Sequence, residues 1–235
     1  HPYTLRIEAP FIGAGAHRLS EIAARIGQPA TSLSRPLGRL VELGFVRREQ
    51  PFGDSERTAK RSLYRIADPF LRLWFSVVAP RRALLVASPR AVRQELWRQT
   101  CTALFAEAWE ELCRQAVPRL AESLPCAFGP AARSWSGAGP EWDVVARSLD
   151  RATLLLGECK WVEGPVSEEL LDRTYQELLR KGRPGGGGGP GTPGARGAEA
   201  TDPVYVLFVP GAPPGGISGK PYRVIGGAEV LAASR

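Results

Sequence analysis

The sequence predicts an α/β fold in which an N-terminal winged helix-turn-helix is followed by a domain with a central mixed sheet. Three observations predict it: two short amphipathic helices precede two strand-like segments, the charge changes sign near residue 100, and the second half mixes strands with helices. Residues 1–100 hold 17 Lys and Arg against 8 Asp and Glu, whereas residues 101–235 hold 14 against 16. A basic half beside a mildly acidic half indicates a polyanion-binding module joined to a second domain, although a basic surface can also serve solubility alone.

The first two helices are predicted over residues 19–27 and 31–43, because their apolar residues recur at helical spacing. Ser20 is expected to cap the first helix, and Gly44 to end the second one in the C′ position. Pro36 lies inside the second helix, where it is expected to remove one hydrogen bond and to kink the helix.

Two strands forming a wing are predicted over residues 45–49 and 62–66, joined by the polar loop 51–61. In a winged helix the second helix can lie in the major groove of DNA while the loop contacts phosphate, and each cation on a phosphate releases a condensed counterion. The side chains expected to contact DNA are Ser32, Ser34, Arg35, Arg39, Arg47, Arg48, Arg57, Lys60 and Arg61. The alternative is a winged helix that packs only against protein.

The remaining elements follow in order. The predicted domains are a winged helix at 1–68, a helical connector at 69–100, and an α/β domain at 101–235. Within the last, the pattern predicts helices at 102–117 and 167–181, the second capped by Ser167, and strands at 141–146, 152–161, 203–209 and 222–225. Residues 182–197 hold 12 Gly or Pro among 16 positions and are expected to form a mobile loop.

Residue counts exclude several kinds of protein. The chain has two His and four Cys without a CxxC pair, so neither a zinc site nor a Ser-His-Asp triad is expected. The cysteines are interpreted as small buried side chains in a reducing, cytoplasmic compartment. No apolar stretch is long enough for a membrane span. Because the chain begins at His1 and contains no Met, we interpret it as a fragment or processed piece.

Arginine outnumbers lysine 27 to 4, so arginine fills most places where any cation would serve. The few lysines therefore merit individual inspection. They are Lys60, Lys160, Lys181 and Lys220.

Asp143, Glu158 and Lys160 form the constellation that carries chemistry, because they lie on two consecutive predicted strands. Residues two apart on a strand point to the same face, so Glu158 and Lys160 project together, and pairing of the strands brings Asp143 near them. We expect Asp143 and Glu158 to bind Mg²⁺ or Mn²⁺, and Lys160 to orient water or stabilise charge on a scissile phosphate.

The spacing Asp-x14-Glu-x-Lys is typical of the PD-(D/E)XK nuclease superfamily, whose restriction-endonuclease-like core has the same order of elements. Glu110, on the first predicted helix of the domain, is the candidate for an additional catalytic carboxylate. The alternative is a charged strand end with an ordinary Glu–Lys ion pair.

Three runs, LYRIADPFLRLWFSVVAP, AWEELC and EWDVVARSLDRATLLLGECKW, together resemble the C-terminal region of archaeal-type DEXX-box ATPases. Those proteins carry an AAA-type ATPase domain, a winged helix and a nuclease-like domain. The resemblance implies a nuclease-like site at Asp143, Glu158, Lys160 and Glu110, and an ATPase domain outside this chain. No GxxxxGK[ST] motif occurs, and residues 215–221, GGISGKP, only approach it, so this chain is not expected to bind ATP.

Two functions are therefore expected as alternatives. The first is Mg²⁺-dependent cleavage of DNA positioned by the winged helix. The second is a non-catalytic regulatory module that grips DNA or a partner protein with a degenerate nuclease fold. The expected partners are DNA and the missing ATPase domain, with a homo-oligomer as a further possibility and no membrane.

Overall fold

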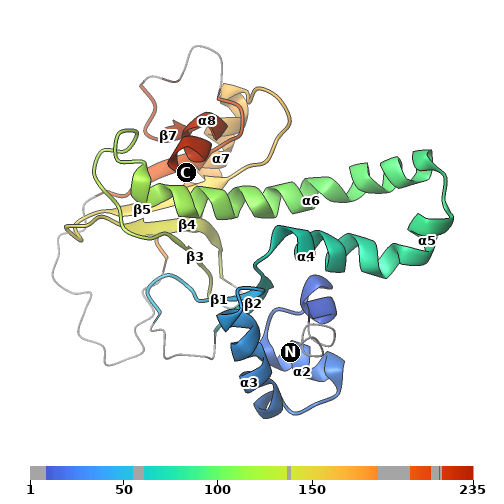
Figure 1. The fold of residues 1–235 in the computed structure, drawn as a ribbon. Helices are drawn as coiled ribbons and strands as arrows, with labels where there is room; N and C mark the ends of the chain where they lie inside the picture. The colour runs from blue at the N-terminus through green and yellow to red at the C-terminus, as the bar shows by residue number, and fades with distance from the viewer. Residues whose placement is uncertain are drawn as a thin grey trace. The chain divides into compact units, whose positions relative to one another are not determined.

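The computed structural model describes residues 9–54, 61–136, 139–184, 202–212, 217 and 219–234 (Figure 1). The chain divides into two compact units, one of His1–Gln50 with Glu56–Leu104 and one of Pro51–Ser55 with Phe105–Arg235. The predicted fold class is confirmed, because a helix-turn-helix with a two-stranded sheet precedes an α/β domain with a five-stranded mixed sheet. The boundaries predicted at residues 68 and 100 stay predictions.

The first unit begins with the helix-turn-helix. Its helices are α2 (Leu19–Ile26) and α3 (Ala30–Glu42), and Gly27 and Gly44 follow them with φ of 74° each, a left-handed conformation that favours glycine. The wing consists of β1 (Val46–Glu49) and β2 (Leu63–Ile66), which pair antiparallel with Val46 opposite Ile66.

The N-terminal cap of α2 and the position of Pro36 in α3 were both subjects of prediction. The capping prediction is wrong, because Arg18 rather than Ser20 precedes α2, and Glu21 accepts hydrogen bonds from the backbone amides of Arg18 and His17 at 3.1 and 3.0 Å. A carboxylate in the first turn satisfies amides that have no partner within the helix. Pro36 does lie inside α3, and the helix continues to Glu42.

A series of helical segments follows the wing. Asp68 caps α4 (Pro69–Leu73) by accepting a hydrogen bond from the Leu71 amide at 2.7 Å. The helix then widens into a π-helical turn over Trp74–Val78 and tightens into a 3₁₀ turn over Ala79–Arg81 before α5 (Arg82–Ala87). The long helix α6 (Arg90–Ala116) starts directly after Pro89, which is a residue that cannot continue a preceding helix.

The second unit is built on the mixed sheet. Its strands, in spatial order, are β3 (Ala132–Ser134), β4 (Trp142–Arg147), β5 (Leu154–Cys159), β6 (Val204–Phe208) and β7 (Arg223–Ile225). The first three pair antiparallel, and β5, β6 and β7 pair parallel. The parallel step from β5 to β6 is made through α7 (Glu168–Lys181), and α8 (Gly227–Ala233) ends the chain's described elements.

Helix α7 begins as predicted, since the Ser167 hydroxyl accepts a hydrogen bond from the Leu170 amide at 3.3 Å. The Gly/Pro-rich stretch predicted over 182–197 lies outside the described residues from 185 onward.

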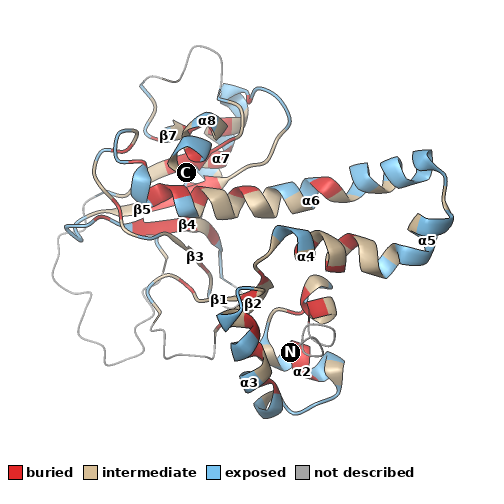
Figure 2. Ribbon diagram, in the orientation of Figure 1, coloured by how far each residue is buried: buried red, intermediate tan, exposed pale blue. Residues whose placement is uncertain are grey.

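Opposite faces of the sheet are covered by different helices. Trp109 and Cys113 of α6 pack with Val144 and Leu155 on one face. On the other face, Leu171 and Leu178 of α7 pack with Val145, Leu156 and Leu207. Figure 2 shows the resulting buried colouring along β4 and β5. A β-bulge in β4, where Ala132 and Ser134 of β3 pair with Val145 and Trp142, interrupts the alternation of side chains near the start of that strand.

Among the described residues, no helix combines the length and apolar composition that a membrane span requires.

Candidate active site

Asp143 and Glu158 lie next to each other on adjoining strands of the sheet. The antiparallel register ends with Val144 opposite Gly157, and Asp143 and Glu158 are the residues that follow this last pair on the two strands. Glu158 alternates with Leu156, which assigns it to the α7 face, whereas the bulge in β4 between Trp142 and Val145 interrupts the alternation at Asp143. The backbone amide of Cys159 donates a hydrogen bond to Asp143 Oδ2 at 3.0 Å and fixes the aspartate against β5.

Glu158 is held by two lysines. Only 7% of the residue is exposed, and its Oε1 lies 3.2 Å from Nζ of Lys160, the residue that follows β5. Its Oε2 lies 2.5 Å from Nζ of Lys181, the last residue of α7. The lysine side chains are 36% and 21% exposed, so the cluster reaches solvent through them.

The environment of Asp143 favours a bound proton. Burial, followed by the neighbouring charges of Glu158 and Glu110, raises the pKa of Asp143 to about 7, against the lowering effects of the Cys159 amide and Lys181. Two carboxylates that share a poorly solvated site are costly to ionise together. The pair can therefore hold a proton near neutral pH or exchange it for a cation.

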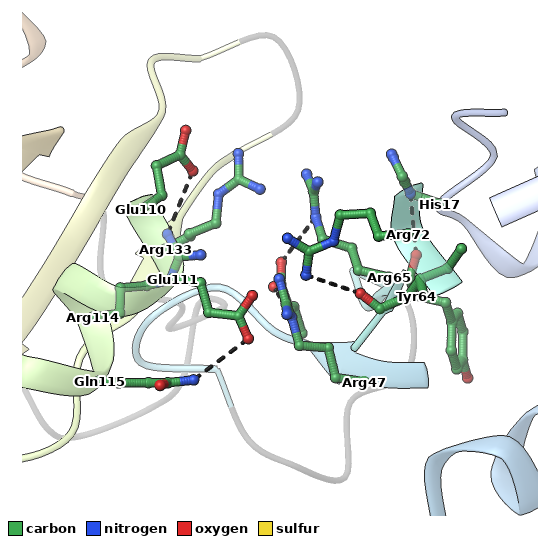
Figure 3. A network of polar contacts seen from close by, with 12 residues as sticks. His17, Arg47, Tyr64, Arg65, Arg72, Glu110, Glu111, Arg114, Gln115 and Arg133 are labelled. Atoms are coloured by element: carbon green, nitrogen blue, oxygen red, sulfur yellow. Dashed lines mark hydrogen bonds and ion pairs between the residues drawn. The ribbon is translucent and has the colours of Figure 1, made fainter. Parts of the chain in front are cut away.

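Glu110 lies on α6, close enough for its charge to raise the pKa of Asp143. Its Oε2 is 3.5 Å from Nη1 of Arg114, one turn further along the same helix (Figure 3). Arg114 also donates a hydrogen bond to the backbone oxygen of Asp143 at 3.1 Å. Of the four predicted catalytic residues, the structure thus brings together Asp143, Glu158 and Lys160, while Glu110 is paired with Arg114 and acts on Asp143 through its charge.

Two adjacent carboxylates suit Mg²⁺, which commonly binds proteins through one or two carboxylates and keeps several waters. Over the described part of the chain, no three His, Cys, Asp or Glu side chains gather into a metal-binding group. A cation that binds Glu158 would have to replace a lysine at one of the two carboxylate oxygens of Glu158. The Glu158–Lys160 ion pair is also what the alternative interpretation of a charged strand end predicted.

The predicted DNA-contacting residues of α3 are all exposed. They are Ser32, Ser34, Arg35 and Arg39. Arg39 forms an ion pair with Glu42 at 3.0 Å, one turn further along the same helix. The opposite side of α3 is buried through Leu33, Leu37 and Leu40, so the helix presents a polar face to solvent.

The wing residues are less uniform. Arg48 is exposed and donates a hydrogen bond to the Ser62 hydroxyl at 2.8 Å. Arg47, in contrast, is partly buried, with Nε 2.7 Å from Oε1 of Glu49 (Figure 3). Arg61 is half-buried, and the predicted contacts Arg57 and Lys60 lie outside the described residues.

Lys181 is a site residue that reasoning from motifs missed. It stands far from the Glu-x-Lys motif in sequence, and the crossover through α7 brings it to Glu158. The scarcity of lysine in this arginine-rich chain was the available signal.

Comparison with known proteins agrees with the first half of this description. Residues 13–50 match the IclR helix-turn-helix domain, which confirms the predicted helix-turn-helix. Residues 74–174 match a family described as archaeal and bacterial proteins of unknown function.

The uncharacterized protein MJECL04 of Methanocaldococcus jannaschii is 23% identical over 184 residues, or 77% of this chain. The match covers 40% of that protein, so this chain corresponds to about two fifths of its relative. Among solved structures, the SdaI restriction endonuclease is similar at 16% identity and a TM-score of 0.20, over 82% of this chain and 70% of that one. So low a score carries no argument about this chain's chemistry.

Proposed function

We propose that this chain binds DNA through its helix-turn-helix and carries a Mg²⁺- or Mn²⁺-dependent phosphodiesterase site at Asp143, Glu158 and Lys160. The observation that carries the proposal is the meeting of two carboxylates and a lysine at one end of the β4–β5 pair, at the spacing of a nuclease motif.

The helix-turn-helix supports the binding part of the proposal. The exposed side of α3 carries Arg35 and Arg39 together with Ser32 and Ser34, and the first 100 residues have a net charge of +9. Cations on phosphates provide affinity by releasing counterions, while hydroxyl and guanidinium groups can read base edges in the major groove.

The site residues support the catalytic part. A bound Mg²⁺ or Mn²⁺ supplies Lewis-acid polarisation of a phosphate and a more acidic water. Asp143 and Glu158 would hold the cation through hard carboxylate oxygens. Lys160, which is partly exposed beside them, would donate to a phosphate oxygen and stabilise the charge that develops there.

A second candidate function is favoured by the lysines. Both oxygens of Glu158 are already paired, with Lys160 and with Lys181, and this arrangement is also that of a degenerate site which grips DNA without cutting it. In that case the second unit would be a regulatory binding module.

We also propose that the chain works together with an ATPase domain. The proposal rests on the resemblance to the C-terminal region of DEXX-box ATPases, and it accords with a relative that is much longer than the matched region. ATP hydrolysis itself would lie outside this chain, which lacks a P-loop motif.

Plasmid nicking in Mg²⁺ or Mn²⁺ tests the catalytic proposal. Asp143→Asn and Lys160→Ala are expected to abolish nicking, whereas Glu169→Gln, an exposed carboxylate at the other end of α7, should leave it unchanged. Equal background from all four proteins, with DNA binding retained, would favour the non-catalytic module.

A further inference from the structure

Lys181 and Lys160 approach one carboxylate from two different elements. Lys181 is the last residue of α7, and its Nζ donates a hydrogen bond to Glu158 Oε2. Lys160 follows β5, and its Nζ donates a hydrogen bond to Glu158 Oε1. Both ammonium groups thus lie on Glu158, the residue next to Cys159, whose backbone amide holds Asp143.

Attachment of α7 to the sheet does not require this ion pair. Leu171 and Leu178 of the helix are fully buried against Leu156 and Leu207, which provides the apolar contact that holds a helix on a sheet. A buried ion pair is weak evidence for stabilisation, because the loss of hydration offsets the attraction between the charges.

The use of lysine at both positions also indicates a role other than attaching α7 to the sheet. The chain uses arginine for nearly all its cations, yet two of its four lysines meet at Glu158. An ammonium group is a compact charge with three rotatable donors on a flexible stem, so it can leave one anion for another more readily than a forked guanidinium can.

We propose that Lys160 and Lys181 form a two-lysine site for a DNA phosphodiester, with Lys181 contacting the phosphate from the side of α7. The inference rests on the proposed function, because it requires a cation to neutralise the carboxylates. When Glu158 binds a cation, the two ammonium groups lose their anionic partner. The bound cation then lies beside them and repels them. A phosphate oxygen is the anion that satisfies both.

Lys220 provides an internal reference for this proposal. Its Nζ lies 2.9 and 2.7 Å from the two oxygens of Asp172, which also accepts a hydrogen bond from Tyr222 at 2.6 Å. That lysine joins the segment before β7 to α7 and is not part of the Glu158 cluster, so a phosphate at the proposed site should leave it unaffected.

Nuclear magnetic resonance of lysine ammonium groups tests the proposal without requiring cleavage. The whole chain is labelled with ¹³C,¹⁵N-lysine, and the signals are assigned with Lys160→Arg and Lys181→Arg, each of which removes one of four signals. Thymidylyl-thymidine, which carries one phosphodiester, is then added in the presence of Ca²⁺, a cation that also takes oxygen ligands.

We expect the Lys160 and Lys181 signals to shift with a common midpoint while the Lys220 signal stays in place. A shift of Lys160 alone would overturn the two-lysine site and leave the proposed function standing. If neither signal moves, the phosphate site is refuted, and the nicking assay decides separately about the metal-dependent function.

A kinetic comparison gives a second readout. Lys181→Gln is expected to lower the rate of nicking at saturating DNA at least tenfold with little change in DNA affinity, and Lys181→Arg should recover part of that rate. The matched control is Arg180→Gln, which removes an exposed positive charge from the adjacent position of α7. Equal rates for Lys181→Gln and Arg180→Gln would contradict the proposal.

Discussion

The backbone amide of Cys159 donates a hydrogen bond to the Asp143 carboxylate across the β4–β5 pair, at 3.0 Å. This contact locks one carboxylate of the candidate site beside the strand that carries the other. Asp143 is consequently placed by backbone geometry, and its ionisation is sensitive to burial and to the charges of Glu158 and Glu110.

The first prediction concerns the pH dependence of stability without divalent cations. The pKa of Asp143 is raised from 3.8 to about 7, so between these values the folded chain holds a proton that the unfolded chain has lost. The contribution of Asp143 is thus full below pH 4 and is lost as the pH rises through 7. We expect this loss to be roughly 1–3 kcal/mol of unfolding free energy, and Asp143→Asn should remove it. Urea unfolding in EDTA measures both. An unchanged difference between pH 5 and pH 8 would contradict the prediction.

The second prediction concerns Gly157, which pairs with Val144 beside the site. A Cβ there would lie 2.9 Å from Cε2 of Phe208 and 3.0 Å from Cβ of Val144. Gly157→Ala should therefore cost about 1–3 kcal/mol of unfolding free energy through overpacking. Gly38→Ala on α3 is the control, because its Cβ would meet nothing within 4 Å and alanine favours a helix. Equal unfolding midpoints for the two variants would refute this account of the sheet.

The third prediction separates DNA contact from structure in the first unit. Arg35→Gln on exposed α3 should weaken binding to duplex DNA and reduce the slope of log affinity against log salt by about one, as expected for one lost phosphate contact. Arg47→Gln should change that slope less, because its guanidinium is engaged by Glu49. Fluorescence anisotropy over a salt series measures both. A larger effect of Arg47→Gln than of Arg35→Gln would show that α3 is not the main contact.

Local sequence rules were sufficient for much of this fold. The helical spacing of α2 and α3, the hydroxyl of Ser167 and the apolar runs of β4 and β5 each predict an element that the structure contains. The meeting of Asp143 with Glu158 was predictable too, because consecutive antiparallel strands bring their neighbouring ends together.

What could not be predicted depends on long-range placement. Lys181 reaches Glu158 because α7 packs on the sheet with its last residue beside Glu158. No short sequence motif indicates this placement. Glu110 has a suitable position in the sequence, but its ion pair with Arg114 on α6 was not visible in the motif. Arg47 lies on a correctly predicted strand, but its side chain forms an ion pair with Glu49, which also pairs with Arg65 of the neighbouring strand.

A crystal structure of the chain soaked in Mn²⁺ tests the central claim most directly. We predict an anomalous peak within coordination distance of both Asp143 and Glu158, with Lys160 and Lys181 displaced from the Glu158 oxygens. An Mn²⁺-soaked crystal in which both lysines stay on Glu158 and no peak lies beside Asp143 would contradict the claim.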